Sequence, residues 1–194
     1  MRHFTILTIL GWLPAMGGGV ELQIQYTAMQ KVLAQQMFAD QGRLWVHGDP
    51  KSKCNFAFLE NPRLGGIDGR LRIQAKFSGR NAASLFGFCL GPGDVFDLDI
   101  MATPYFQEGA IRLKDVYVES GGRETFYSRK VREAIRDKLP KKFEYRVSDE
   151  VRKIMEREPS NRPYQQELKN FTVSQVRVTT AAMILGLEFT LVVK

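Results

Sequence analysis

Apolar residues recur at helical spacing soon after residue 19. The intervals between them are four, three, four and four residues, which places them on one face of an α-helix. These residues are Leu22, Tyr26, Met29, Leu33 and Met37. The pattern predicts an amphipathic helix that begins near Leu22 and ends near Asp40, where Gly42 follows.

Between residues 55 and 120 the chain alternates apolar and polar positions. A period of two is typical of antiparallel strands with one buried face. The alternating runs are 56–58, 71–78, 96–103, 111–114 and 116–119. The alternation changes phase at Lys114 and Asp115, which predicts a β-bulge. Turns are expected at Gly65-Gly66, Asp68-Gly69, Gly91–Asp94 and Glu108-Gly109.

Helical spacing returns in the charged region 124–157. One stripe runs from Tyr127 to Leu139 and is expected to stop at Pro140. A second runs from Phe143 to Ile154, with a cap expected at Ser148. Strand patterns then follow at 171–178 and 185–193.

This order of elements predicts an α+β fold. We expect a long curved antiparallel sheet wrapped on the N-terminal helix, a late two-helix segment and a C-terminal hairpin. The strand near residues 95–106 is long, and a long sheet with one apolar face needs a cover of similar length. The N-terminal helix is the expected cover.

Residues 1–19 have the pattern of a secretory signal peptide. Arg2 and His3 precede the apolar run 4–13, and small residues end at Gly19. We therefore expect a signal peptide at 1–19 and a single α+β domain at 20–194, exported to the periplasm or the extracellular space. The alternative is a buried N-terminal strand or helix of a cytosolic protein.

The chain contains two cysteines, Cys54 and Cys89. In an oxidising compartment an even pair favours a disulfide. The alternative is two buried thiols. A metal site is not expected, because no histidine or further cysteine lies at ligand spacing near either one.

Catalytic candidates are few, and no cofactor motif is present in the sequence. His47 is the one histidine beyond the first few residues, and we interpret it as a surface or hydrogen-bonding residue. Asp94, Asp97 and Asp99 are close enough in sequence to suggest a calcium site, but we favour their interpretation as a solvated strand face that discourages edge pairing. We expect a protein that is not an enzyme.

The chain is basic, with a net charge of +7. Residues 123–170 hold half of its 28 Lys and Arg residues, interleaved with acidic ones. This segment is suited to an anionic membrane surface, and nucleic acid is not expected as a partner of an exported protein. The alternative is a solvated helical face of mixed charge.

Bulky apolar residues remain as the candidates for a ligand site. They either fill a core or line an elongated cavity for a lipid or another long apolar molecule, and methionine suits a ligand of variable shape. The predicted ligand-binding residues are Tyr26, Met29, Leu33, Met37, Phe56, Phe58, Phe77, Phe96, Leu98 and Phe189.

The arrangement of these segments resembles the tubular lipid-binding (TULIP-like) superfamily, and small periplasmic lipid-binding proteins within it. The segments that carry the resemblance are Leu22–Met37, Leu71–Phe77, Phe96–Ala102, Ala110–Val118 and Leu185–Leu191. The resemblance implies binding of lipids or other long apolar molecules, without catalysis.

Three hypotheses of function follow. The first is an exported, non-catalytic binding protein for a lipid or another long apolar ligand. The second is a structural or envelope-interaction module that docks on anionic surfaces through the basic helices at 124–157. The third, ranked lowest, is a hydrolase that uses Asp97 and Asp99.

Overall fold

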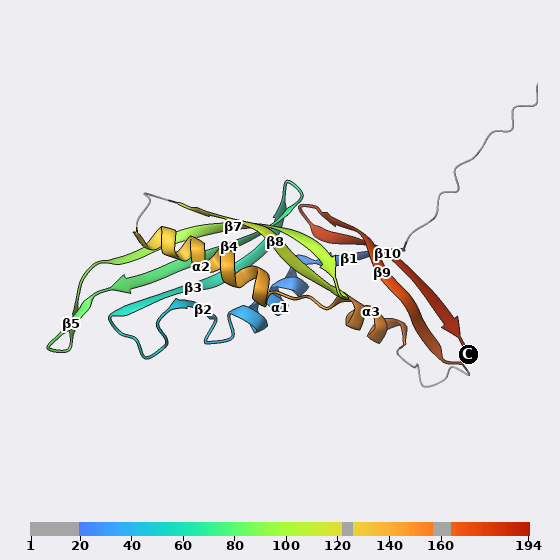
Figure 1. The fold of residues 1–194 in the computed structure, drawn as a ribbon, viewed down its shortest axis with the longest axis horizontal. Helices are drawn as coiled ribbons and strands as arrows, with labels where there is room; N and C mark the ends of the chain where they lie inside the picture. Colours follow the sequence, from blue (N-terminus) through green and yellow to red (C-terminus); the bar gives the residue numbers. More distant parts are fainter. Residues whose placement is uncertain (1–19, 122–125, 157–163) are drawn as a thin grey trace, which may run out of the picture.

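The protein is an elongated, curved molecule built from two antiparallel sheets placed end to end (Figure 1). The computed structural model describes residues 20–121, 126–156 and 164–194. The predicted signal peptide, residues 1–19, lies outside the described residues. Within those three ranges, no helix has the length and apolar character needed to cross a membrane.

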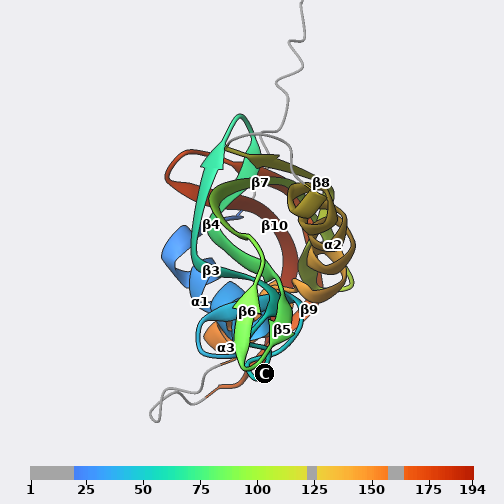
Figure 2. The same ribbon diagram turned by 90° about the vertical axis from the view of Figure 1, so that its left-hand side faces the viewer.

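A five-stranded sheet forms one half of the molecule. Its strands, in spatial order, are β2 (Arg43–His47), β3 (Asn55–Ile67), β4 (Arg70–Asn81), β7 (Gly93–Gln107) and β8 (Ala110–Ser120). The sheet curls into a half-barrel (Figure 2). Because side chains alternate across a strand, one row of apolar residues gathers on the concave face. Its buried members include Leu59, Ile73, Phe77, Leu98 and Ile100.

The second sheet has the order β1 (Val20–Gln25), β10 (Ala182–Val193) and β9 (Gln166–Val178). The predicted C-terminal hairpin is therefore confirmed, and β9 is one continuous strand. A small third sheet pairs β5 (Ala83–Leu85) with β6 (Phe88–Leu90) and forms a hairpin at the far end of the molecule (Figure 1).

The start of the first helix was predicted wrongly. Residues 20–25 form β1, which pairs with the free edge of β10, and α1 spans Tyr26–Met37. Leu22 lies four residues before Tyr26 but also two residues before Ile24, so its spacing fits a helix and a strand equally well. The edge of β10 decides between them, because pairing satisfies backbone groups that a helix would satisfy locally.

The predicted wrapping of the long sheet on the N-terminal helix is confirmed, but a second helix shares the cover. Helix α1 packs against β3 and β1, whereas α2 (Phe126–Lys142) packs against β8 and also reaches β2. These two strands are the opposite edges of the five-stranded sheet. Figure 2 shows α2 running beside β8 along the curled sheet. Helix α2 therefore closes the half-barrel, and α1 contributes to one end of its interior.

The helical boundaries after residue 124 differ from the prediction. Helix α2 continues through Pro140 to Lys142, since a proline in the last turn removes only one of the remaining helical hydrogen bonds. Helix α3 spans Val147–Met155, and buried Phe143 lies between the two helices. The expected cap at Ser148 is absent, because Arg146 precedes the helix and the Ser148 amide instead donates to the Gly109 carbonyl.

The predicted β-bulge is confirmed. Thr103 pairs with Lys114 and Met101 pairs with Tyr117, so three steps along β8 oppose two steps along β7. Asp115 takes up the extra residue with a φ of 50°. The turns predicted at 68–69 and 108–109 are also confirmed, with positive φ at all four residues.

The turn predicted at Gly65 and Gly66 is wrong, because both residues lie inside β3. A Cβ atom at Gly66 would lie 2.1 Å from the Thr179 carbonyl oxygen and 2.2 Å from the Tyr26 hydroxyl. That hydroxyl donates a hydrogen bond to the Thr179 carbonyl. The glycine is needed because α1 and the turn between β9 and β10 approach β3 closely here, where the two large sheets meet. Burial raises the pKa of Tyr26.

We expect Gly66→Ala to lower the free energy of unfolding by about 1–3 kcal/mol, since the added methyl group overlaps backbone that has little room to move. Gly65→Ala is the matched control, because a Cβ atom at Gly65 meets nothing within 4 Å. Urea unfolding followed by circular dichroism measures both. Equal stability of the two variants would contradict the close approach at Gly66.

Candidate functional site

The inner face of α2 carries an apolar stripe. Val131, Ile135 and Leu139 recur every four residues and are all buried. This spacing keeps them on one side of the helix, and that side faces the concave surface of the five-stranded sheet. We use the word trough for this concave surface together with the side chains of α1 and α2 that face it.

The trough encloses a small apolar cavity. Its volume is about 10 Å³, which is room for about one water molecule. The lining residues come from α1, α2 and four strands, and they are Leu33, Met37, Phe38, Leu44, Val46, Leu59, Ile73, Ile100, Ala134, Ile135, Lys138 and Leu139. Side chains of α1 and α2 together fill most of the trough.

A larger hollow lies beside this cavity and opens to solvent. Its volume is about 320 Å³, and it lies between the middle of α2 and the ends of β2, β3 and β4. The hollow shares Val46 and Ala134 with the inner cavity. Its other lining residues are His47, Asn55, Ala57, Asn81, Lys130 and Val131. The apolar inner cavity therefore adjoins an open hollow with a partly polar rim.

Directional hydrogen bonds fix the segment that follows α2. Tyr145 and Ile111 exchange two backbone hydrogen bonds of 3.0 and 2.8 Å, which attach this segment to β8. The Gln36 side chain donates to the Glu144 carbonyl at 2.6 Å and accepts from the Glu144 amide at 3.1 Å. These four bonds hold the segment against both β8 and α1.

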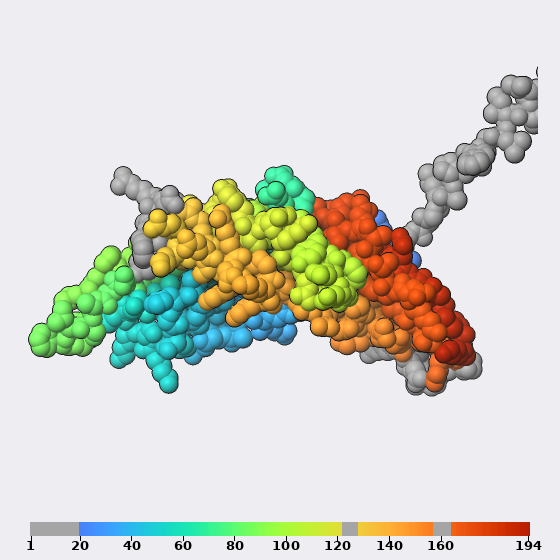
Figure 3. Space-filling model, viewed as in Figure 1, coloured from blue at the N-terminus to red at the C-terminus, as the bar shows by residue number. Residues whose placement is uncertain are grey.

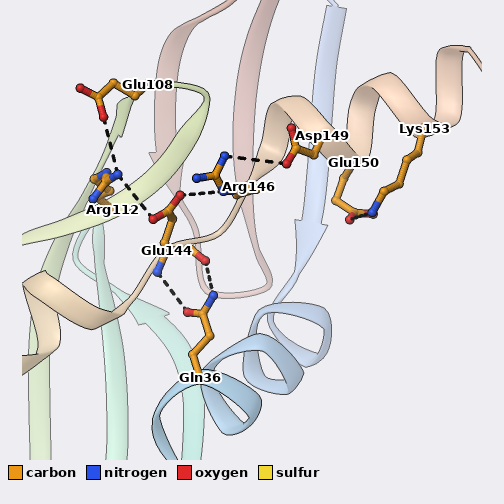
Figure 4. A network of polar contacts seen from close by, with 8 residues as sticks. All are labelled: Gln36, Glu108, Arg112, Glu144, Arg146, Asp149, Glu150 and Lys153. Atoms are coloured by element: carbon orange, nitrogen blue, oxygen red, sulfur yellow. Dashed lines mark hydrogen bonds and ion pairs between the residues drawn. The ribbon is translucent and has the colours of Figure 1, made fainter.

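Ion pairs reinforce the same segment (Figure 4). The Glu144 carboxylate lies 3.4 Å from the Arg112 guanidinium of β8 and 2.9 Å from the Arg146 guanidinium. Arg112 also pairs with Glu108 in the turn between β7 and β8, at 3.7 Å. The C-terminal end of α2 is consequently anchored at residues 143–146.

Helix α2 itself meets the trough mainly through aliphatic side chains. Contacts between aliphatic groups are non-directional, so a different apolar group can replace them. One directional contact crosses to the far edge of the sheet, where the Lys138 ammonium donates to the Trp45 carbonyl at 3.2 Å. The helix thus combines a C-terminal anchor of directional bonds with an apolar face toward the trough.

The structure brings together seven of the ten predicted ligand-binding residues around the concave face. Leu33 and Met37 line the inner cavity, and Tyr26 and Met29 are buried on the same helix. Phe77 and Leu98 are buried in the sheet. Phe96 lies next to them, half-buried, with its ring centre 4.5 Å from that of Phe77.

The remaining predicted residues lie elsewhere. Phe58 pairs in register with Trp45 and Ser78, so it points to the outer face of the sheet, opposite Leu59. There it packs against Trp45, Phe56 and the Arg43 guanidinium. Phe189 is half-buried in β10 of the other sheet. Their assignment as ligand-binding residues stays a prediction, and the trough does not include Phe56, Phe58 or Phe189.

Sequence reasoning missed the residues that α2 and β2 contribute to the trough. These are Leu44, Val46, Val131, Ile135 and Leu139. The spacing of four in α2 was a sufficient signal for an inward face. The lysines and arginines around this stripe instead led to the prediction of an outward-facing surface for anionic partners.

The disulfide prediction is confirmed. Cys54 and Cys89 are bonded, with their Cα atoms 5.1 Å apart. Cys54 immediately precedes β3 and Cys89 lies in β6, so the bond ties the β5–β6 hairpin to the five-stranded sheet.

The polar candidates do not assemble into a reactive centre. His47 is exposed at the rim of the outer hollow. Asp97 and Asp99 lie on the outer face of β7, where Asp99 accepts two hydrogen bonds from Arg72, of 2.7 and 2.9 Å. Across the described part of the chain, no group of three or more His, Cys, Asp or Glu residues is placed to hold a metal ion.

Comparison with known proteins gives one similarity. The chain matches no protein-family model and no curated protein. It is similar to the crystal structure of lipopolysaccharide binding protein, with a TM-score of 0.33 and 16% sequence identity. The alignment covers 90% of this chain and 51% of that one, so this chain spans about half the length of that protein. A similarity at this TM-score supports no statement about the function of this chain.

The Arg72–Asp99 pair gives a pH dependence. The hydrogen bond from Arg72 lowers the pKa of Asp99. A lowered folded-state pKa stabilises the protein above the unfolded value of about 3.9, and that stabilisation is lost as the pH falls through the folded value. Because the pair is about one-third exposed, we expect Asp99→Asn to cost less than about 1 kcal/mol at pH 7 and nothing once Asp99 is protonated.

Urea unfolding between neutral and strongly acidic pH measures this dependence. Asp97→Asn is the matched control, because Asp97 is an exposed carboxylate on the same face of β7. A constant difference between Asp99→Asn and the parent protein across the whole pH range would contradict a role for the ionised pair.

Proposed function

We propose that this chain is an exported, non-catalytic protein that binds a lipid or another long apolar molecule in the trough, with α2 as a displaceable cover. One observation carries the proposal. The amphipathic helix α2, together with side chains of α1, covers the apolar concave face of a half-barrel, and an open hollow adjoins that face beside α2.

Burial of the α2 side chains in the trough and burial of an acyl chain there contribute comparable free energies. Burial of Val131, Ile135 and Leu139 contributes about 1.5–3 kcal/mol for each side chain, or about 5–9 kcal/mol together. An acyl chain of about ten to twelve carbons that replaces them would bury methylene groups at about 0.8 kcal/mol each, or about 8–10 kcal/mol. Exchange of the helix face for a hydrocarbon chain is therefore close to balanced.

The anchor at residues 143–146 makes such an exchange reversible. Backbone hydrogen bonds between Tyr145 and Ile111 do not depend on whether the trough is filled by α2 or by a ligand. The hydrogen bonds between Gln36 and Glu144 also do not depend on what fills the trough. A displaced α2 would stay attached beside the trough and would return once the ligand leaves.

Export is supported by the disulfide. The bond between Cys54 and Cys89 suits an oxidising compartment, and the signal-peptide pattern at 1–19 agrees with this location. The absence of catalysis is likewise part of the proposal. It is supported by the apolar lining of the inner trough and by the engagement of Asp99 with Arg72.

A second candidate is a structural or envelope-interaction module that docks through its basic helices. The filled inner cavity favours it, because a solid core needs no ligand. Its basic surface would come from α2, where Arg136 and Lys142 are exposed, while exposed Lys141 pairs with Asp137. Helix α3 is less suitable, since Lys153 pairs with Glu150 at 2.9 Å within the helix.

A bulky side chain placed between the outer hollow and the inner cavity distinguishes the lipid-binding protein from the docking module. Ala134 lines both the outer hollow and the inner cavity, so we expect Ala134→Trp to fill the entrance and weaken binding of a fluorescent long-chain fatty acid at least tenfold. Glu133→Trp is the matched control, because Glu133 is the neighbouring residue and is exposed on the outer face of α2.

Fluorescence titration, with native mass spectrometry to detect copurified ligand, measures the effect. The lipid-binding proposal requires the parent protein and Glu133→Trp to bind and Ala134→Trp to bind much less. No fatty-acid binding by the parent protein, together with salt-sensitive binding to anionic vesicles, would favour the docking module instead. Equal binding by both tryptophan variants would place the ligand outside the trough.

A further inference from the structure

The β5–β6 hairpin presents apolar side chains to solvent at one end of the molecule. It projects beyond the five-stranded sheet, at the opposite end from the carboxyl terminus (Figure 3). Phe86 is 95% exposed, Phe88 73%, Leu90 60% and Leu85 47%. A cluster of large apolar side chains at a narrow tip is unusual on a soluble surface and marks an interaction site.

The backbone at the tip makes Phe86 a costly choice for the turn. The two-residue connection Phe86-Gly87 has φ values of 50° and 82°, and Leu85 pairs with Phe88 across it. Turns of this kind prefer asparagine or aspartate followed by glycine, because a bulky side chain is strained at positive φ. The hairpin itself gains no packing from a ring that is 95% exposed, so the ring is suited to an external partner.

The hairpin is held rigidly enough to present these side chains. A two-stranded hairpin is marginally stable alone in water. Here the Cys54–Cys89 disulfide fixes β6 to the start of β3, and the Ala82 amide donates to the Cys54 carbonyl at 2.8 Å. Cys89 stands between Phe88 and Leu90, so the bond acts at the base of the apolar tip.

Basic residues surround the base of the hairpin. The exposed basic residues are Lys51, Lys53, Arg80 and Lys130. Lys51 and Lys53 lie in the loop that ends at Cys54, and Lys130 lines the hollow with Asn55 and Asn81. The acidic residues nearby are Asp49, whose carboxylate accepts hydrogen bonds from the Lys51 and Ser52 amides, and half-buried Asp94. The excess of positive charge complements an anionic surface.

The size of the tip excludes a second copy of the chain as a stable partner. The four apolar side chains offer on the order of 500 Å² in total, below the roughly 800 Å² that each partner buries in a standard interface. A bilayer requires no matching shape, and a narrow apolar tip can enter the boundary between headgroups and acyl chains to a depth of about 5–10 Å.

We propose that the β5–β6 hairpin is a membrane-insertion element that seats Phe86, Phe88, Leu85 and Leu90 in the surface of a bilayer containing anionic lipids. The basic residues at its base contact the headgroups. The inference does not rest on ligand binding in the trough. It also places the inserted side chains on a different part of the chain from the basic helices α2 and α3, although Lys130 at the base of the hairpin belongs to α2.

The test is co-sedimentation of the purified full chain with vesicles of phosphatidylcholine containing about one-third phosphatidylglycerol. We expect the double variant Phe86→Asn/Phe88→Asn to bind at least tenfold more weakly than the parent protein. Ile154→Asn is the matched control, because Ile154 is 67% exposed but lies on α3. It should bind like the parent protein.

Two further measurements separate a lost contact from a lost fold. Phe86→Asn alone should unfold at the same or a higher temperature than the parent protein, because asparagine suits the positive φ. Phe86→Trp should show blue-shifted emission with vesicles, quenched by lipids brominated near the headgroup. Ala134→Trp should still bind vesicles even if it no longer binds fatty acid, which keeps the two proposals distinguishable.

Several outcomes would overturn the proposal. Unchanged vesicle binding by the double variant would remove the tip as the contact. Loss of binding in Ile154→Asn but not in the double variant would assign it to the helices. Self-association of the parent protein in solution that the double variant abolishes would make the tip an interface between copies of this chain.

Discussion

Burial of the concave face is the constraint on which the rest of the structure depends. A curled sheet of five strands places a continuous row of apolar side chains on one side, including Leu59, Ile73 and Ile100, and these must be covered. Its two edge strands, β2 and β8, do not meet, so the cover has to come from another element. Helix α1 supplies part of it, and helix α2, which contacts both edges, supplies Val131, Ile135 and Leu139. If α2 always stays on the concave face, the molecule has a solid core. If α2 can leave that face, the molecule can hold an apolar ligand there.

The way in which α2 is attached favours the second possibility. Its C-terminal end is fixed by directional bonds at Glu144 and Tyr145, while its face toward the sheet is aliphatic, and we propose that a hydrocarbon chain can replace that face. At the N-terminal end of α1, the hydrogen bond from Tyr26 to Thr179 ties this helix to the β9–β10 turn of the second sheet, and both groups lie close to Gly66 of the first sheet. The rigid parts of the molecule therefore lie around the trough, and the part suited to exchange lies across it. The exposed hairpin tip lies at the same end as the open hollow, which would bring the entrance of the trough close to a membrane.

Much of the fold follows from local sequence patterns, and the errors share one cause. Strict alternation located β4, β7 and β8, and a single change of phase located the bulge at Asp115. Leu22 was assigned to a helix because its spacing fits two structures, and only the free edge of β10 decides between them. Gly66 was interpreted as a turn residue because glycine allows both turns and close approaches, and the close neighbour, Thr179, is distant in sequence. For the candidate site, periodicity identified which residues of α1 and α2 are apolar, but the helix that covers the sheet depends on where the chain returns in space.

Hydrogen exchange of the backbone amides, with and without dodecanoic acid, tests most directly whether α2 is a displaceable cover. We expect amides of α2 from about residue 128 to residue 139 to exchange much faster when the fatty acid is added. Amides of β4 and of the anchored Tyr145 should keep their protection, because the sheet and the anchor do not move. Protection of α2 equal to that of β4, unchanged by the fatty acid, would contradict the account and leave the half-barrel as a solid core.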